Sequence, residues 1–166
     1  MAMEDVKPRV LRWLEELKLA SEKVENPKAD LHLLVEFPRE TGQKLDLIFP
    51  REEDLLLIGC AIPVPEEHQA LMEKLKPRER DAIIWDFRYS FSFMSVGFNL
   101  YHPEGILKRF TVSTGIYADG LTKDSFVRAL TDIHKTKILG IWIMERRFGY
   151  TPPRGADKTP STDMYV

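Results

Sequence analysis

Hydrophobic residues recur at helical spacing near the start of the chain. Val6, Val10 and Trp13 fall three or four positions apart, and charged residues occupy the positions between them. One apolar stripe opposite a polar face is typical of an amphipathic helix packed on a core. The pattern predicts a helix over residues 4–19, in a segment that Asn26-Pro27 closes because a residue before proline is pushed out of helical geometry.

Three short apolar runs follow, each ending at a proline. The runs cover residues 31–37, 45–49 and 55–62. The polar spacers between them have the length of turns, which is typical of antiparallel strands joined as a meander. Residues 21–25 provide a weaker candidate for a fourth strand.

The middle of the chain predicts helices. Pro65 with two following acids suits a helix N-terminus, and Pro77 interrupts that helix and starts another. Aromatic residues then occupy every second position from Trp85 to Phe93. A period of two indicates a strand, but the apolar positions also keep helical spacing, and we favour a helix to about Met94.

The last third predicts a hairpin and a long helix. Residues 96–102 and 106–118 flank a Pro-Glu-Gly turn, after which Thr122 suits a helix N-cap and Gly149 a C-cap. The element order is α-βββ-α-ββ-α. It predicts an α+β fold in which an antiparallel sheet of about five strands has helices packed against it. We expect a single domain over residues 1–149 and a proline-containing C-terminal tail over 150–166.

Composition narrows the class of protein. The 166 residues are 43% hydrophobic, and 24 Lys and Arg balance 26 Asp and Glu for a net charge of −2. This balance gives no general attraction to nucleic acid. No apolar start resembles a secretory signal, and the apolar run 138–144 is too short to span a membrane. We expect a soluble cytoplasmic protein, and the scarcity of Asn and Gln beside abundant Glu, Lys and Arg is typical of heat-adapted proteins.

No motif carries recognisable chemistry. The histidines lie more than 30 positions apart, without a local metal-binding pair; they are His32, His68, His102 and His134. Cys60 lies in an apolar run that supplies no cation to activate a thiol, so we expect a buried strand residue. Neither a nucleophile elbow nor a phosphate-binding loop is present. The sequence therefore predicts no catalytic residue, no cofactor and no metal site.

The last predicted helix has an unusual second half. Residues 138–144 are apolar on all sides, whereas a helix lying on a sheet needs only one buried stripe. Either the N-terminal helix, through Trp13, covers the far side, or the stretch is an interface with a partner or a second copy. The residues of that candidate interface are Ile138, Ile141, Trp142 and Met144.

The element order resembles the type III secretion chaperone-like fold. The segment from Phe110 to Leu130, a strand leading through Asp119-Gly120-Leu121-Thr122 into a helix, is similar to the strand-to-last-helix passage of that fold. Length and element order also resemble small archaeal proteins of a domain-of-unknown-function family. The resemblance implies dimerisation and the binding of extended protein segments, and it brings no catalytic residues.

Three functional hypotheses follow. The first is a non-enzymatic, chaperone-like or adaptor domain that binds a protein partner or itself as a homodimer. The second is a small enzyme whose site is assembled from distant residues such as His102 and Asp119. The third, which the charge balance does not favour, is a nucleic-acid-associated module using basic residues near the C-terminus; these are Lys135, Lys137, Arg146, Arg147 and Arg154.

Overall fold

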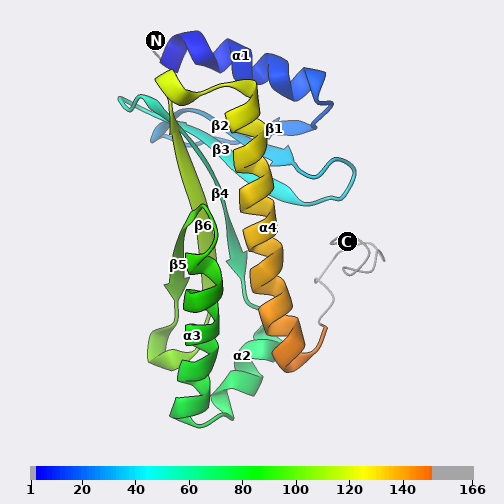
Figure 1. The fold of residues 1–166 in the computed structure, drawn as a ribbon, viewed down its shortest axis with the longest axis vertical. Coiled ribbons are helices and arrows are strands. Elements are labelled where there is room, and N and C mark those ends of the chain that lie inside the picture. The colour runs from blue at the N-terminus through cyan, green and yellow to red at the C-terminus, as the bar shows by residue number, and fades with distance from the viewer. Residues whose placement is uncertain (1–2, 151–166) are drawn as a thin grey trace. The chain divides into compact units, whose positions relative to one another are not determined.

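The computed structural model describes residues 3–150, in which one helix is followed by four strands, two helices, two further strands and a long last helix (Figure 1). Two short 3-10 turns, η1 and η2, flank the last strand. The elements are α1 (Met3–Glu16), β1 (Ser21–Lys23), β2 (Ala29–Glu36), β3 (Lys44–Pro50), β4 (Leu55–Pro63), α2 (Glu66–Glu73), α3 (Pro77–Ser92), β5 (Gly97–Tyr101), η1 (Pro103–Gly105), β6 (Arg109–Tyr117), η2 (Ala118–Gly120) and α4 (Lys123–Phe148). Most of the predicted elements are present, and the predicted tail beyond Tyr150 lies outside the described residues.

The six strands form one open sheet in the order β1-β2-β3-β4-β6-β5. Strands β1 to β4 pair as an antiparallel meander, with His32 opposite Ile48 and Asp46 opposite Gly59. The predicted α+β class is confirmed, but the sheet has six strands rather than about five. The additional strand is β1, the weak candidate near residue 21, which pairs along the edge of β2 although all three of its residues are exposed.

The described chain divides into two compact units. The first takes its residues from 3–60 and 113–134, and the second from 61–112 and 135–150. Strands β4 and β6 and helix α4 each pass from one unit into the other. The expectation of a single domain over 1–149 stays a prediction.

In the first unit, burial alternates along the strands. Val35, Leu45 and Leu47 are fully buried, while neighbouring positions on the opposite sheet face are half-buried. Such alternation shows that one face of the sheet is covered. Trp13 of α1 packs against Phe126 of α4 with 5.8 Å between ring centroids, so α1 and the first turns of α4 share this core.

In the second unit, α4 approaches its neighbours closely at Gly140. A Cβ there would lie 2.5 Å from Cζ of Phe110 in β6 and 2.9 Å from Cζ of Phe91 in α3. Real Cβ atoms do not come so near, so glycine is what allows the helix backbone to reach these two rings.

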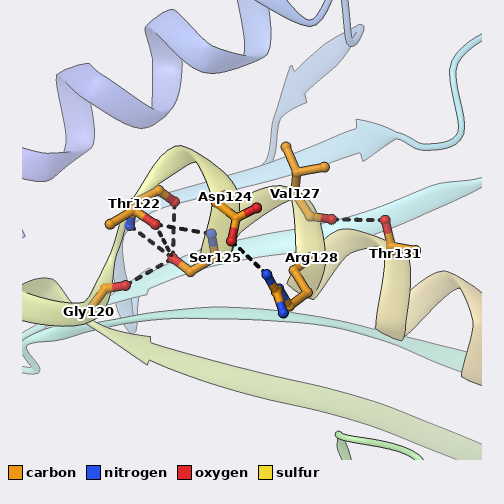
Figure 2. A network of polar contacts seen from close by, with 7 residues as sticks. All are labelled: Gly120, Thr122, Asp124, Ser125, Val127, Arg128 and Thr131. Atoms are coloured by element: carbon orange, nitrogen blue, oxygen red, sulfur yellow. Dashed lines mark hydrogen bonds and ion pairs between the residues drawn. The ribbon is translucent and has the colours of Figure 1, made fainter.

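Helix α4 begins as predicted. The Ser125 backbone N–H donates to Thr122 Oγ1 at 3.1 Å, and the Thr122 N–H donates to Ser125 Oγ at 2.9 Å (Figure 2). This reciprocal pair is a capping box in which serine replaces the usual acid. The helix ends at Phe148, and Gly149 follows with φ of +84°, as expected for a glycine C-cap.

Two local expectations need correction. Helix α1 ends at Glu16 rather than near residue 19, because Lys18 turns into the left-handed region with φ of +55° and closes the helix. Cys60 lies on β4 as predicted but is half-buried rather than fully buried, since the second half of that strand alternates between half-buried and exposed positions.

Candidate protein-interaction surface

Helix α3 carries two aromatic rows on opposite sides. The inner row, Phe87 and Phe91, is fully buried and packs against Phe110 at centroid distances of 5.3 and 5.7 Å. The outer row, which we call the aromatic ridge, consists of Trp85, Tyr89 and Phe93. These side chains are 44%, 65% and 86% exposed.

The alternating aromatic residues are the sequence signal for this ridge. Aromatic residues at alternate positions from 85 to 93 fall on one face of a strand. In a helix each residue is rotated by about 100° from the one before it, so residues two positions apart lie about 200° apart around the axis. The five aromatic residues therefore separate into two rows, and within each row the residues are four positions apart. The confirmed helix buries the row at 87 and 91, which leaves the row at 85, 89 and 93 on the outside.

Two of the three ridge side chains contact neighbouring side chains of α3. The rings of Trp85 and Tyr89 lie 5.5 Å apart, and the Arg88 guanidinium carbon lies 4.7 Å from the Trp85 ring centroid. Ring–ring and cation–π contacts of this kind restrict the indole to one orientation. A side chain that is already restricted loses less conformational entropy when it becomes buried at an interface.

Charged groups flank the ridge and anchor the helix that carries it. Arg147 of α4 forms an ion pair with Asp86, beside Trp85, with an N···O distance of 2.9 Å. At the other end of α3, Arg80 donates to the carbonyl oxygens of Met72, Glu73 and Leu75. These bonds hold α3 against the end of α2 and the residues that follow it, where the Met72 carbonyl also accepts from the Leu75 N–H.

The predicted interface residues of α4 have different environments. Ile138 and Met144 are buried within the chain, each 3% exposed, whereas Ile141 is half-buried and Trp142 is 45% exposed. The all-round apolar stretch is therefore largely accounted for by core packing on more than one side. Of the four predicted residues, Trp142 and in part Ile141 are accessible to another molecule, as are the half-buried Leu139 and Ile143 beside them.

The polar cluster around His32 is saturated by hydrogen bonds. Its Nε2 lies 2.7 Å from Asp46 Oδ1, and its Nδ1 lies 3.2 Å from the Asn26 amide nitrogen. The Lys28 N–H donates to the Asn26 carbonyl oxygen at 3.0 Å, which orients the amide so that its NH2 donates to the ring. In the neutral ring, Nε2 then donates to Asp46 and Nδ1 accepts from Asn26, so both ring nitrogens have a hydrogen-bond partner within the chain.

The other candidate residues lie in separate structural settings. His68 is buried, with Nε2 3.0 Å from the Gly149 carbonyl oxygen, and the His134 ring meets the edge of Phe37 at 5.9 Å. His102 precedes η1, and Asp119 is exposed in η2. Within residues 3–150, no three His, Cys, Asp or Glu side chains are grouped so that they could hold a metal ion.

The basic residues of the C-terminal region are partly paired. Arg147 forms an ion pair with Asp86, and Arg154 lies outside the described residues.

Of the helices in the described part of the chain, none combines the length and the apolar character that crossing a bilayer requires.

Comparison with known proteins identifies the family. The family model described as an uncharacterized conserved protein (DUF2299) matches residues 6–144. A crystal structure of an uncharacterized protein from Methanothermobacter thermautotrophicus has 31% sequence identity and a TM-score of 0.81, covering 86% of this chain and 99% of that one. The structure of YbjN from E. coli has 17% identity and a TM-score of 0.43 over 84% of this chain and 90% of that one, which is too weak to support a shared fold or function.

The expected resemblance to archaeal proteins of unknown function is thus confirmed, while the resemblance to secretion chaperones stays a prediction. No curated protein matches the chain. The match over residues 6–144, together with the archaeal structure, shows that the chain belongs to the DUF2299 family of uncharacterized conserved proteins.

Proposed function

We propose that the chain is a cytoplasmic, non-enzymatic protein-binding domain and that the aromatic ridge of α3 is its docking surface. The observation that carries this proposal is the exposure of three aromatic side chains in one row, reaching 86% at Phe93. Aromatic residues are enriched at the centres of protein interfaces, where their large apolar area is buried with few rotatable bonds.

The area of the ridge is large enough for this role. An aromatic side chain buries about 150–250 Å², so the exposed parts of the three ridge residues amount to about 400 Å². Contiguous apolar patches of about 300–600 Å² are the largest that a typical monomer exposes, and they are often functional. Burying this area is worth roughly 10 kcal/mol at about 25 cal/mol per Å², against an association cost of about 4–15 kcal/mol.

Trp142 provides a second proposed contact on α4. Its 45% exposure matches that of Trp85, and tryptophan is among the residues most enriched at binding hot spots. Of the interface residues predicted from the sequence, we retain Trp142 and Ile141 as contact candidates. Ile138 and Met144, being buried, act through the core of the chain.

Photo-crosslinking tests the proposal directly. Phe93 is replaced by the photoreactive analogue p-benzoylphenylalanine, and the matched control places the same group at Leu71 of α2, another exposed apolar position at 39%. After illumination in the cells that express the chain, we expect discrete adducts from position 93 and only background from position 71.

Competition establishes that the ridge itself is recognised. Excess unlabelled chain should suppress adducts with a different protein and increase adducts of twice the chain's mass, whereas excess chain carrying Trp85→Ser, Tyr89→Ser and Phe93→Ser should do neither. Equal adduct yields at positions 93 and 71, or suppression by the triple variant, contradict the proposed docking surface.

A further inference from the structure

The outward face of α3 is a straight row that continues beyond the ridge. Six exposed positions form a stripe from Arg78 to the C-cap residue Phe93, and the exposed Glu79, Asp81 and Ser92 lie outside it. In order they are Arg78, Ala82, Trp85, Asp86, Tyr89 and Phe93. Such spacing places all six along one side of the helix, over about 22 Å at 1.5 Å per residue.

We propose that this row binds a second copy of the chain, with the two α3 helices antiparallel and the two-fold axis between Trp85 and Asp86. The inference rests on the proposed function, because it names the partner of the same docking surface. A two-fold interface requires a surface that complements itself, and the order of residues along α3 meets that requirement.

Size and charge are complementary in the antiparallel arrangement. Positions equally distant from the axis face each other, so the small side chain of Ala82 meets the partner's Tyr89. Arg78 meets the partner's Phe93, which pairs a guanidinium with an aromatic ring. Ala82 leaves room for the phenol ring, as helix–helix contacts need when large side chains interdigitate.

A parallel arrangement would oppose identical residues. Arg78 would then face the partner's Arg78, and Phe93 would compete for space with the partner's Phe93. Like charges held together at an interface are strongly unfavourable, and two large rings at one level leave Ala82 facing an empty space. The order of residues therefore favours the antiparallel arrangement.

The ion pair at Asp86 prevents charge repulsion at the proposed two-fold axis. Asp86 and the partner's Asp86 lie near each other beside the two-fold axis, and two unpaired carboxylates would repel. Each is bound by Arg147 of its own chain at 2.9 Å, so the axis carries two neutralised pairs. Arg147, which lies on α4 and outside the row, thereby becomes a determinant of dimerisation.

The area buried between the two ridges indicates the affinity expected of the dimer. Two ridges together bury about 800 Å², below the roughly 1,200–2,000 Å² of stable complexes. The dimer should accordingly depend on protein concentration. Sedimentation equilibrium should show the average mass rising from 19.3 kDa toward twice that value as concentration increases.

Substitutions of charged residues distinguish this specific interface from nonspecific hydrophobic association. Arg147→Gln should weaken the dimer at least 10-fold by exposing the carboxylate repulsion, and adding Asp86→Asn should restore most of the loss. Ala82→Glu should weaken it by a similar factor, while the control Leu71→Ser should leave the dissociation constant unchanged.

Single cysteines report the orientation. In a Cys60→Ser background, Asp86→Cys lies beside the axis and should form an intermolecular disulfide, for which the two Cα atoms must come within about 7 Å. Arg78→Cys should not, because two such residues lie about 22 Å apart along an antiparallel pair. Efficient linkage at both positions would overturn the antiparallel arrangement.

The outcomes separate the two proposals. A mass that stays at 19.3 kDa up to millimolar concentration overturns the second-copy inference. If position 93 still crosslinks to a different protein in that case, the docking surface stands and only its partner changes. If position 93 gives no specific adduct either, both proposals fail.

Discussion

Helix α3 presents the same kind of residue to two opposite environments. Phe87 and Phe91 are fully buried against Phe110, whereas Tyr89 and Phe93, two positions along, are mostly exposed. Exposed aromatic residues at helical spacing contribute little to the stability of an isolated chain. The inner row therefore maintains the fold, while the outer row is exposed and available for binding.

The largest effect should come from the inner row. Phe91→Ala removes a fully buried ring that also contacts Phe98 and Phe110, and the free energy of unfolding should fall by about 3–5 kcal/mol. The control Phe93→Ala, two residues away, should change it by less than about 0.5 kcal/mol. Urea unfolding measures both, and equal losses would remove the distinction between the rows.

A smaller loss of stability should follow when the close contact between Gly140 of α4 and the buried rings is disturbed. Gly140→Ala places a Cβ where Phe91 and Phe110 already lie. Overpacking of this kind costs about 1–3 kcal/mol, which exceeds the roughly 1 kcal/mol that alanine gains over glycine in a helix. Thermal unfolding should show a lower midpoint, and an unchanged or raised midpoint would show that the rings move aside without cost.

Loss of the α4 cap should lower stability without affecting the ridge. Thr122→Ala removes the hydroxyl that accepts the Ser125 N–H, at a cost of about 1 kcal/mol. Because both residues lie far along the chain from α3, the dimer dissociation constant should stay the same. A parallel loss of binding would mean that the ridge depends on general stability, and would contradict its independence from the α4 cap.

The smallest effect on stability should accompany the largest effect on binding. Phe93→Ser replaces a side chain that is 86% exposed, so unfolding should change by no more than about 0.5 kcal/mol. Dimerisation and crosslinking through neighbouring ridge positions should fall at least 10-fold. Unfolding and sedimentation of the same sample provide the test, and a stable variant that still dimerises normally would contradict the role of the ridge.

Local patterns predicted most elements, since the information lies within a few residues. Thr122 marked the start of α4, and prolines marked the ends of the meander strands. The depth of burial could not be predicted in this way, because it depends on which distant elements meet. Ile138 and Trp142 occupy the same apolar stretch, yet tertiary packing buries one and exposes the other.

The same reason explains why the ridge and the His32 cluster were missed. The alternating aromatics from 85 to 93 fit a strand face or two helical rows, and only the helix assignment makes Trp85, Tyr89 and Phe93 an exposed set. The pairing of His32 with Asp46 depends on the register between β2 and β3, which the sequence pattern did not specify.

Binding of a second copy through the ridge can be followed by 19F NMR of the full chain labelled with 5-fluorotryptophan, recorded over a range of concentrations. The three tryptophans report on three environments: Trp13 in the core, Trp85 on the ridge and Trp142 on α4. Assigned with single Trp→Phe variants, the Trp85 resonance should shift with concentration while the Trp13 resonance stays constant. A Trp85 resonance that does not change up to millimolar concentration would contradict the binding of a second copy through the ridge.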